Sequence, residues 1–284
     1  MRQQSILFGN GFNLLSKGTP SWDKLIYDIS SKDLNPGIPN TLKYEAIMLG
    51  KPYKSDTYLA AEDGSFITSE TGELILMSSD MTETLLKQKV ASRVKDFQSN
   101  PAYSFLAKLN VDHYITTNYD NTLINTIGDK NLLMKVKSER LYSIRRRYGI
   151  NNQGKVISYW PIHGNIDTPA SIMLGFDHYC GSLNRIESYI KGTYEMPEHG
   201  VIERMSDRLK ESINEPLSWI DLLFTSDIHI IGLGLSFEET DLWWVLNKRA
   251  RMKWAGDNIF NRIFYYPTQN LSNDIRQMLQ QFDV

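Results

Sequence analysis

The sequence contains a single cysteine, Cys180, among its 284 residues. One cysteine excludes an intramolecular disulfide framework and any zinc site built from four cysteines. The five histidines are scattered, and no His-x-x-x-His pair is present to bind zinc on one face of a helix. We therefore expect no metal, and a protein suited to a reducing compartment, which we take to be the cytoplasm.

Long apolar runs and an excess of charge of one sign are also missing. No apolar stretch approaches the roughly 20 residues needed to span a bilayer. The apolar segment near the N-terminus is too short for the core of a signal peptide. The 31 basic and 33 acidic residues give a formal net charge of −2, which does not favour nucleic acid as a partner. We expect neither a membrane nor a direct nucleic-acid partner.

Two common catalytic motifs are absent as well. The chain has no Gly-x-x-x-x-Gly-Lys-Ser/Thr loop of an ATP-hydrolysing P-loop protein, and no Gly-x-Ser-x-Gly nucleophile elbow. It also has no internal repeat, low-complexity segment or linker rich in proline, glycine and serine. Because 41% of the residues are hydrophobic and 23% charged, the composition is that of an ordinary globular protein. We predict a single domain over residues 1–284.

Short apolar segments alternate with amphipathic ones along much of the chain. The pattern predicts strands at residues 5–8, 112–117, 156–162, 228–231 and 263–266, a further apolar run at 172–175, and helices at 179–190, 201–213, 237–254 and 271–282. This alternation is typical of α/β proteins with a Rossmann-like parallel sheet covered by helices on both faces. From about residue 32 to 110 the pattern is mostly helical, which predicts an insertion that could cover a site.

Four of the predicted strands run into segments rich in glycine and polar side chains. These segments are Gly9-Asn10-Gly11-Phe12-Asn13, Thr117-Asn118-Tyr119-Asp120, His163-Gly164-Asn165 and Gly232-Leu233-Gly234-Leu235-Ser236. In parallel sheets, ligands bind outside the carboxyl ends of the strands. We therefore expect the four segments to converge on one crevice that holds a nucleotide.

The glycine segments each allow two interpretations. Gly9 and Gly11 would let backbone N–H groups approach a diphosphate, although glycines after a strand are also typical of a simple turn. Gly232 and Gly234 would leave room for a ribose or adenine. The alternative is a plain helix start, because Ser236 and the glutamate three residues later have the spacing of a capping box.

The two candidate catalytic residues are Asn118 and His163. The Asn118 amide could orient a ribose or a water molecule, or it could cap the helix that follows. His163 lies at a strand end beside Gly164, where a packed core imidazole is less expected than in mid-strand. With an ordinary pKa of about 6.5 it would accept a proton near neutral pH. His113 and His229 lie within strands, and we interpret them as structural.

Taken in order, the four segments resemble the sirtuin-like family. The first is similar to its Gly-Ala-Gly phosphate loop, the second to its Thr-Gln-Asn-x-Asp segment, the third to its catalytic His-Gly, and the fourth to the loop that holds adenosine. Similarity is greatest to the divergent bacterial branch that degrades NAD in anti-phage defence, with Ser21-Trp22 and the segment Leu174-Gly175-Phe176-Asp177-His178-Tyr179 as further signatures. The opening segment also resembles abortive-infection proteins of lactococcal type.

The resemblance implies an NAD hydrolase that releases nicotinamide and ADP-ribose. It implies Asn118 and His163 as catalytic residues, with His163 acting on a ribose hydroxyl or on the attacking water. It also implies NAD contacts from a longer set of residues, namely Gly9, Asn10, Gly11, Phe12, Asn13, Thr117, Asp120, Gly232, Gly234 and Ser236. A homo-oligomer, with an ATPase or another defence protein as partner, is a further implication.

Two other functions stay open at this stage. The chain could bind NAD or ADP-ribose without turnover, as a sensor or scaffold subunit. It could instead be a zinc-free NAD-dependent deacylase or ADP-ribosyltransferase, although the family's deacylases carry a four-cysteine zinc module that this sequence lacks.

Overall fold

The computed structural model describes residues 2–30, 37–49, 82–128, 132–135, 143–196, 200–268 and 270–284. Residues 50–81, in the middle of the predicted insertion, lie outside the described residues. None of the described helices is long and apolar enough to cross a membrane.

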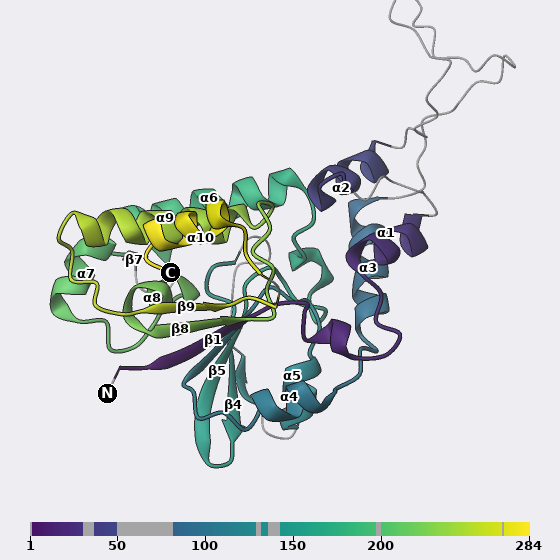
Figure 1. Ribbon diagram of the computed structural model, residues 1–284, viewed down its shortest axis with the longest axis horizontal. Helices are drawn as coiled ribbons and strands as arrows, with labels where there is room; N and C mark the ends of the chain where they lie inside the picture. The colour runs from purple at the N-terminus through teal and green to yellow at the C-terminus, as the bar shows by residue number, and fades with distance from the viewer. Residues whose placement is uncertain are drawn as a thin grey trace, which may run out of the picture.

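A mostly parallel seven-stranded sheet organises the described chain (Figure 1). In sheet order the strands are β3 (Leu132–Lys135), β4 (Tyr148–Asn152), β5 (Lys155–Pro161), β2 (His113–Thr116), β1 (Gln4–Phe8), β8 (Asp227–Ile231) and β9 (Ile263–Tyr266). Strands β5, β2, β1, β8 and β9 are mutually parallel. The predicted α/β fold is therefore confirmed, with one difference: β3 and β4 form an antiparallel edge that was not predicted.

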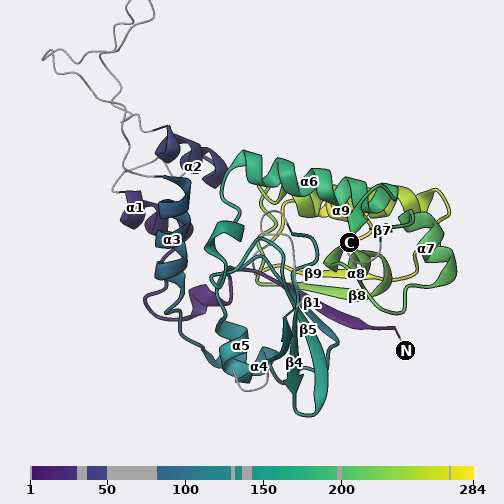
Figure 2. The same cartoon turned by 180° about the vertical axis from the view of Figure 1, so that it is seen from behind.

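Side chains that alternate along each strand enter two different cores. Leu7 of β1 packs in the core formed with α6 (Phe176–Lys191), α7 (Met205–Glu211), α8 (Trp219–Thr225) and α9 (Thr240–Trp254). Its neighbours Ile6 and Phe8 pack in a second core with α4 (Pro101–Leu106) and α5 (Thr122–Ile127). Figures 1 and 2 show these two groups of helices on opposite faces of the sheet. Both faces are thus covered, as parallel strands require.

The helices α1 (Trp22–Ser30), α2 (Asn40–Met48) and α3 (Glu83–Val94) form a separate group beyond the C-terminal ends of the strands (Figure 1). Their apolar side chains, including Leu25, Ile47 and Leu86, form a third core. Tyr119 and Ile172, from the loops after β2 and β5, belong to the same core. The group is therefore anchored on two of the four loops expected to form the site.

Two helices differ from the sequence prediction. The apolar run at residues 172–175, for which no helix or strand was predicted, follows the short 3₁₀ helix Pro169–Ser171. The helix predicted at 201–213 begins only at Met205, because Gly200–Val201 is strand β7, paired with β6 (Glu195–Met196). Helix α8 was missed, although Ser218 caps it and Asp221 completes a capping box.

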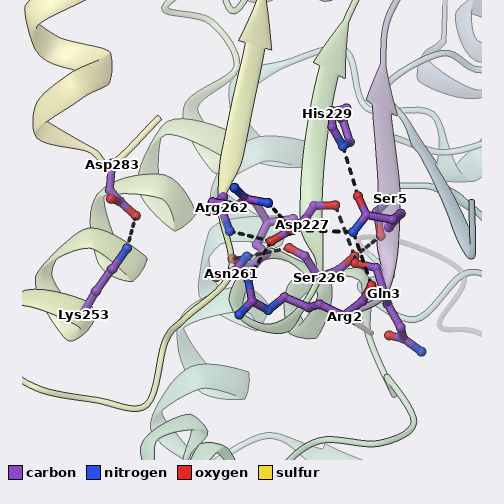
Figure 3. Close-up of polar contacts among 12 residues, drawn as sticks. Arg2, Gln3, Ser5, Ser226, Asp227, His229, Lys253, Asn261, Arg262 and Asp283 are labelled. Atoms are coloured by element: carbon purple, nitrogen blue, oxygen red, sulfur yellow. Dashed lines mark hydrogen bonds and ion pairs between the residues drawn. The ribbon is translucent and has the colours of Figure 1, made fainter.

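The N-terminal ends of the strands are joined by a polar network around Asp227 (Figure 3). The buried Asp227 carboxylate accepts hydrogen bonds from Arg2 Nη1 at 3.0 Å and from the Arg262 backbone N–H at 2.8 Å. In the middle of β8, His229 contacts the Gln4 side chain at 3.2 Å and the hydroxyl of Tyr266, the last residue of β9, at 2.8 Å. These bonds connect β1, β8 and β9, so we interpret this end of the sheet as structural. After β9, helix α10 (Asn273–Gln281) packs by Leu279 in the same core as α9.

Candidate functional site

A cavity of about 420 Å³ opens at the C-terminal ends of the parallel strands. Each of the four predicted segments contributes to its wall. The predicted residues that line it are Asn10, Gly11, Thr117, Asn118, His163, Gly232, Gly234 and Ser236. The structure therefore brings together loops that lie up to 226 residues apart in the sequence, Asn10 to Ser236, at the edge of a parallel sheet where ligands bind.

The loops after β1 and β8 touch at the point where the strand order reverses. From β1 the sheet continues to β2 on one side and to β8 on the other. The Gly11 N–H donates a hydrogen bond to the Gly232 carbonyl oxygen at 2.9 Å. A Cβ at Gly11 would lie 2.6 Å from that oxygen, and Gly232 itself has φ +63°. Glycine is thus required at both positions for the loops to approach, and such switch points are where α/β sheets bind ligands.

Four of the predicted contact residues do not line this cavity. Gly9 lies behind the wall, where a Cβ would be 2.6 Å from a Leu233 methyl group. Phe12 packs in the core against Phe8 and Tyr103. Asn13 donates from Nδ2 to Asp120 Oδ2 at 2.8 Å and accepts from the Tyr103 hydroxyl at 2.7 Å. We therefore reinterpret Gly9, Phe12, Asn13 and Asp120 as residues that support the first two loops from behind.

Asn118 is held at the cavity wall by three hydrogen bonds, one of them from its Nδ2 to the Tyr103 hydroxyl at 3.4 Å. Its backbone N–H donates to Thr116 Oγ1 at 3.0 Å, and its Nδ2 donates to the Gly9 carbonyl oxygen at 3.2 Å. Within the described part of the chain, no residue donates to Asn118 Oδ1. Helix α5 begins after Asn121, so the capping interpretation of Asn118 is wrong. The fixed amide can instead offer its oxygen to a hydroxyl group of a ligand.

His163 is 2% exposed and lies between two carboxylates. Its Nε2 is 2.9 Å from Asp241 Oδ2, and its Nδ1 is 3.6 Å from Glu239 Oε2. Burial alone would lower the pKa of His163, but the charge and hydrogen bond of Asp241 and the charge of Glu239 outweigh burial and raise that pKa to about 9. The expectation of an imidazole with an ordinary pKa is therefore wrong. At neutral pH His163 is an imidazolium and cannot accept a proton.

Sequence reasoning missed the two acidic residues as part of the site. Glu239 lines the cavity directly, and Asp241 lies behind His163 with 1% of its side chain exposed. The predicted capping box does not form, because α9 begins only at Thr240 and no side chain caps it. The signal in the sequence was the acidic run Glu238-Glu239-Thr240-Asp241 directly after the glycine segment.

Glu239 and its neighbours form a charge cluster. Burial raises the pKa of Glu239 to about 7, the nearby His163 cation opposes that rise, and Asp241 and Glu238 add to it. His163, Glu239 and Asp241 place one ligand atom each within 4.8 Å of one another, a spacing that a metal ion could use. Because Nε2 and Oδ2 already share a hydrogen bond, we interpret the three residues as an ion-paired cluster rather than a metal site.

The opposite wall of the cavity is apolar and comes from α1, α2 and α3. It includes Trp22, Ile26, Tyr44 and Leu86. The Asn40 backbone N–H donates to Glu238 Oε2 at 2.8 Å, which ties the start of α2 to the loop after β8. Helices α2 and α3, which lie between residues 32 and 110, line the cavity together with α1, which precedes that range. The cavity combines an apolar wall with few polar groups, as ligand pockets do.

We predict that folding stability decreases between pH 6.5 and pH 9. The pKa of His163 is raised in the folded state, so its contribution is fully present below its unfolded value of about 6.5 and is lost as the pH rises through about 9. The shift corresponds to a loss of about 3 kcal/mol. Urea unfolding at a series of pH values measures it, and a free energy of unfolding that stays constant across this window would contradict the ion pair.

A scan of protein-family models and a search of curated proteins return no match to this chain.

Proposed function

We propose that the cavity binds NAD and that the protein hydrolyses the bond between nicotinamide and ribose. The observation that carries this proposal is the convergence of Gly11, Asn118, His163 and Gly232 around one cavity at the switch point of the sheet. These are the segments in which the sequence resembles NAD-degrading sirtuin-like proteins.

The cavity offers a suitable place for each part of a dinucleotide. Gly234, in the loop after β8, lines the cavity and has no atom within 4 Å of the place where a Cβ would lie, so its backbone is open to a diphosphate. The apolar wall from α1–α3 suits the flat faces of the nicotinamide and adenine rings. Asn118 Oδ1 is available to a ribose hydroxyl. In this arrangement the rings, the ribose and the diphosphate of NAD lie against different walls of the cavity.

The charges at the site also fit the reaction. The departing nicotinamide is a cationic ring in NAD, and positive charge spreads over the ribose as the bond to C1′ breaks. One imidazolium and two carboxylates, when Glu239 is ionised, leave a net charge of −1 beside this centre. Fixed negative charge aimed at developing positive charge lowers the barrier of such a step.

The test of the proposal is the loss of NAD in the presence of the purified protein. We expect equal amounts of nicotinamide and ADP-ribose, measured by chromatography, with and without nucleotide or phage-derived activators. Calorimetric binding of NAD without products would instead indicate a sensor or scaffold subunit. Turnover only with an acylated peptide or a protein acceptor would indicate a deacylase or ADP-ribosyltransferase.

The resemblance to NAD-degrading sirtuin-like proteins is the basis for a proposed biological role. We propose an anti-phage role through abortive infection in the cytoplasm, a homo-oligomer, and an ATPase or another defence protein as partner. Light scattering after size exclusion measures the oligomeric state directly.

A further inference from the structure

Glu239 is a carboxylate at the cavity wall whose buried Oε2 makes no hydrogen bond within the described part of the chain. Its backbone, in contrast, is fixed: the N–H donates to the Ser236 carbonyl oxygen at 3.0 Å, and the carbonyl oxygen accepts from the Trp243 N–H at 3.0 Å. A buried polar atom without a partner costs stability, so its presence in a cavity points to a ligand that completes it.

The other acidic groups near the cavity are less able to accept a proton from a ligand than Glu239. Glu238 also lines the cavity, but its Oε2 accepts the Asn40 N–H. Asp241 bonds to His163 and does not line the cavity. His163 Nε2 is bonded to Asp241, and the raised pKa of His163 leaves the imidazolium without a lone pair to accept a proton at neutral pH. Glu239 is therefore the acidic group best placed to accept a proton.

Resting on the proposed NAD hydrolysis, we propose that Glu239 is the catalytic carboxylate that accepts the proton of the attacking water. His163 and Asp241 are positioning residues behind it. Asp241 fixes the imidazolium, and the imidazolium holds the Glu239 carboxylate at 3.6 Å by its charge.

The step balances in atoms and electrons. The oxygen of water forms a bond to C1′ of the ribose as the bond from C1′ to the nicotinamide nitrogen breaks. The electron pair of the broken bond goes to that nitrogen, which neutralises the pyridinium ring and releases nicotinamide. The proton of the water passes to Glu239 and then to solvent, so the products are nicotinamide, ADP-ribose and one proton.

The surroundings of Glu239 suit a group that gains and loses a proton near neutral pH. Burial raises its pKa to about 7, close to the value at which a general base works best. The titratable groups that face it from the packed elements are His163 after β5, Tyr119 after β2, Tyr179 of α6, and Glu238 and Asp241 at the start of α9. Burial raises the pKa of both tyrosines, so they stay neutral in this range.

The experiment compares Glu239→Gln with wild type at pH 8. We expect turnover of NAD to fall by about 10²–10⁴-fold, the usual contribution of a general base, while the calorimetric Kd for NAD changes little. Glu239→Asp should recover part of the turnover. The matched control is Glu83→Gln, which removes the carboxylate of a second His–Glu pair, 3.0 Å from His178 and outside the cavity wall, and should retain wild-type turnover.

The outcomes separate this inference from the proposed function. A Glu239→Gln variant that turns over NAD like wild type overturns the role of Glu239 and leaves NAD hydrolysis standing. A loss of NAD affinity that accounts for the whole loss of turnover also overturns it, because Glu239 would then only bind substrate. A wild type that binds NAD but never cleaves it overturns both.

Discussion

Replacing His163 with alanine should lower the free energy of unfolding by about 3–5 kcal/mol. The substitution leaves the Asp241 carboxylate, with 1% of its side chain exposed, without its partner cation. It also removes the cation that lies between Asp241 and Glu239. Urea unfolding of the variant and wild type at pH 7 measures the difference.

The double variant His163→Ala/Asp241→Asn is the control for this prediction. Removing both members of a buried pair costs far less than removing one, so the second substitution should recover most of the lost stability. It should also abolish the decrease in stability between pH 6.5 and pH 9, because His163 is then absent. A double variant less stable than His163→Ala would contradict the ion pair.

The single variant His163→Ala also distinguishes a positioning role of His163 from a purely structural one. The His163 cation lowers the pKa of Glu239, so its loss should move the rise of NAD turnover with pH upward by about 1–3 pH units. A structural role would reduce turnover equally at every pH. The double variant, which lacks both charges, should show a smaller displacement.

Replacing Asn118 with alanine should reduce NAD turnover by about 100-fold or more. The substitution removes the amide that lines the cavity and also its hydrogen bond to the Gly9 carbonyl oxygen. Displacement of a positioned group by about 1 Å is enough for a loss of this size. Turnover under saturating NAD, measured as nicotinamide release, tests it.

Asn121→Ala is the matched control for Asn118. Asn121 lies in the same loop, and its Nδ2 bonds to Asp167 at 3.0 Å, but it does not line the cavity. The control should keep turnover close to that of wild type. Equal losses in both variants would mean that the loop is merely destabilised, and wild-type turnover in Asn118→Ala would remove Asn118 from the reaction.

Much of the fold was predictable because its signals are local. The run Ile228, Ile230 and Ile231 ends at a glycine, which predicts a buried strand, and β8 lies there. The antiparallel strand β4 was not predictable in the same way. Its sequence Tyr-Gly-Ile-Asn-Asn has little apolar alternation, although its partner β5 begins only three residues after β4 ends. The local signal was the turn between them, Gln153-Gly154, where both residues have φ > 0 as two-residue hairpin turns require.

The residues of the candidate site were likewise predictable only in part. Residue type and position after a strand predicted that Gly11, Asn118 and His163 face a crevice, because parallel strands end at one edge of a sheet. The same criteria failed for Phe12 and Asn13, which follow the same strand but turn into the core. The direction of a side chain in a loop depends on what packs behind it.

The sequence by itself determined the class of fold, the lack of a cysteine zinc module, and the four loops that meet at the cavity. Only the tertiary structure decided how those loops work. It placed Asp241 and Glu239 on either side of His163, and this changes the imidazole from a proton acceptor into a cation. The reason is physical: a pKa is set by burial and by charges a few ångströms away, and the nearest of these charges come from residues more than 70 positions further along the chain.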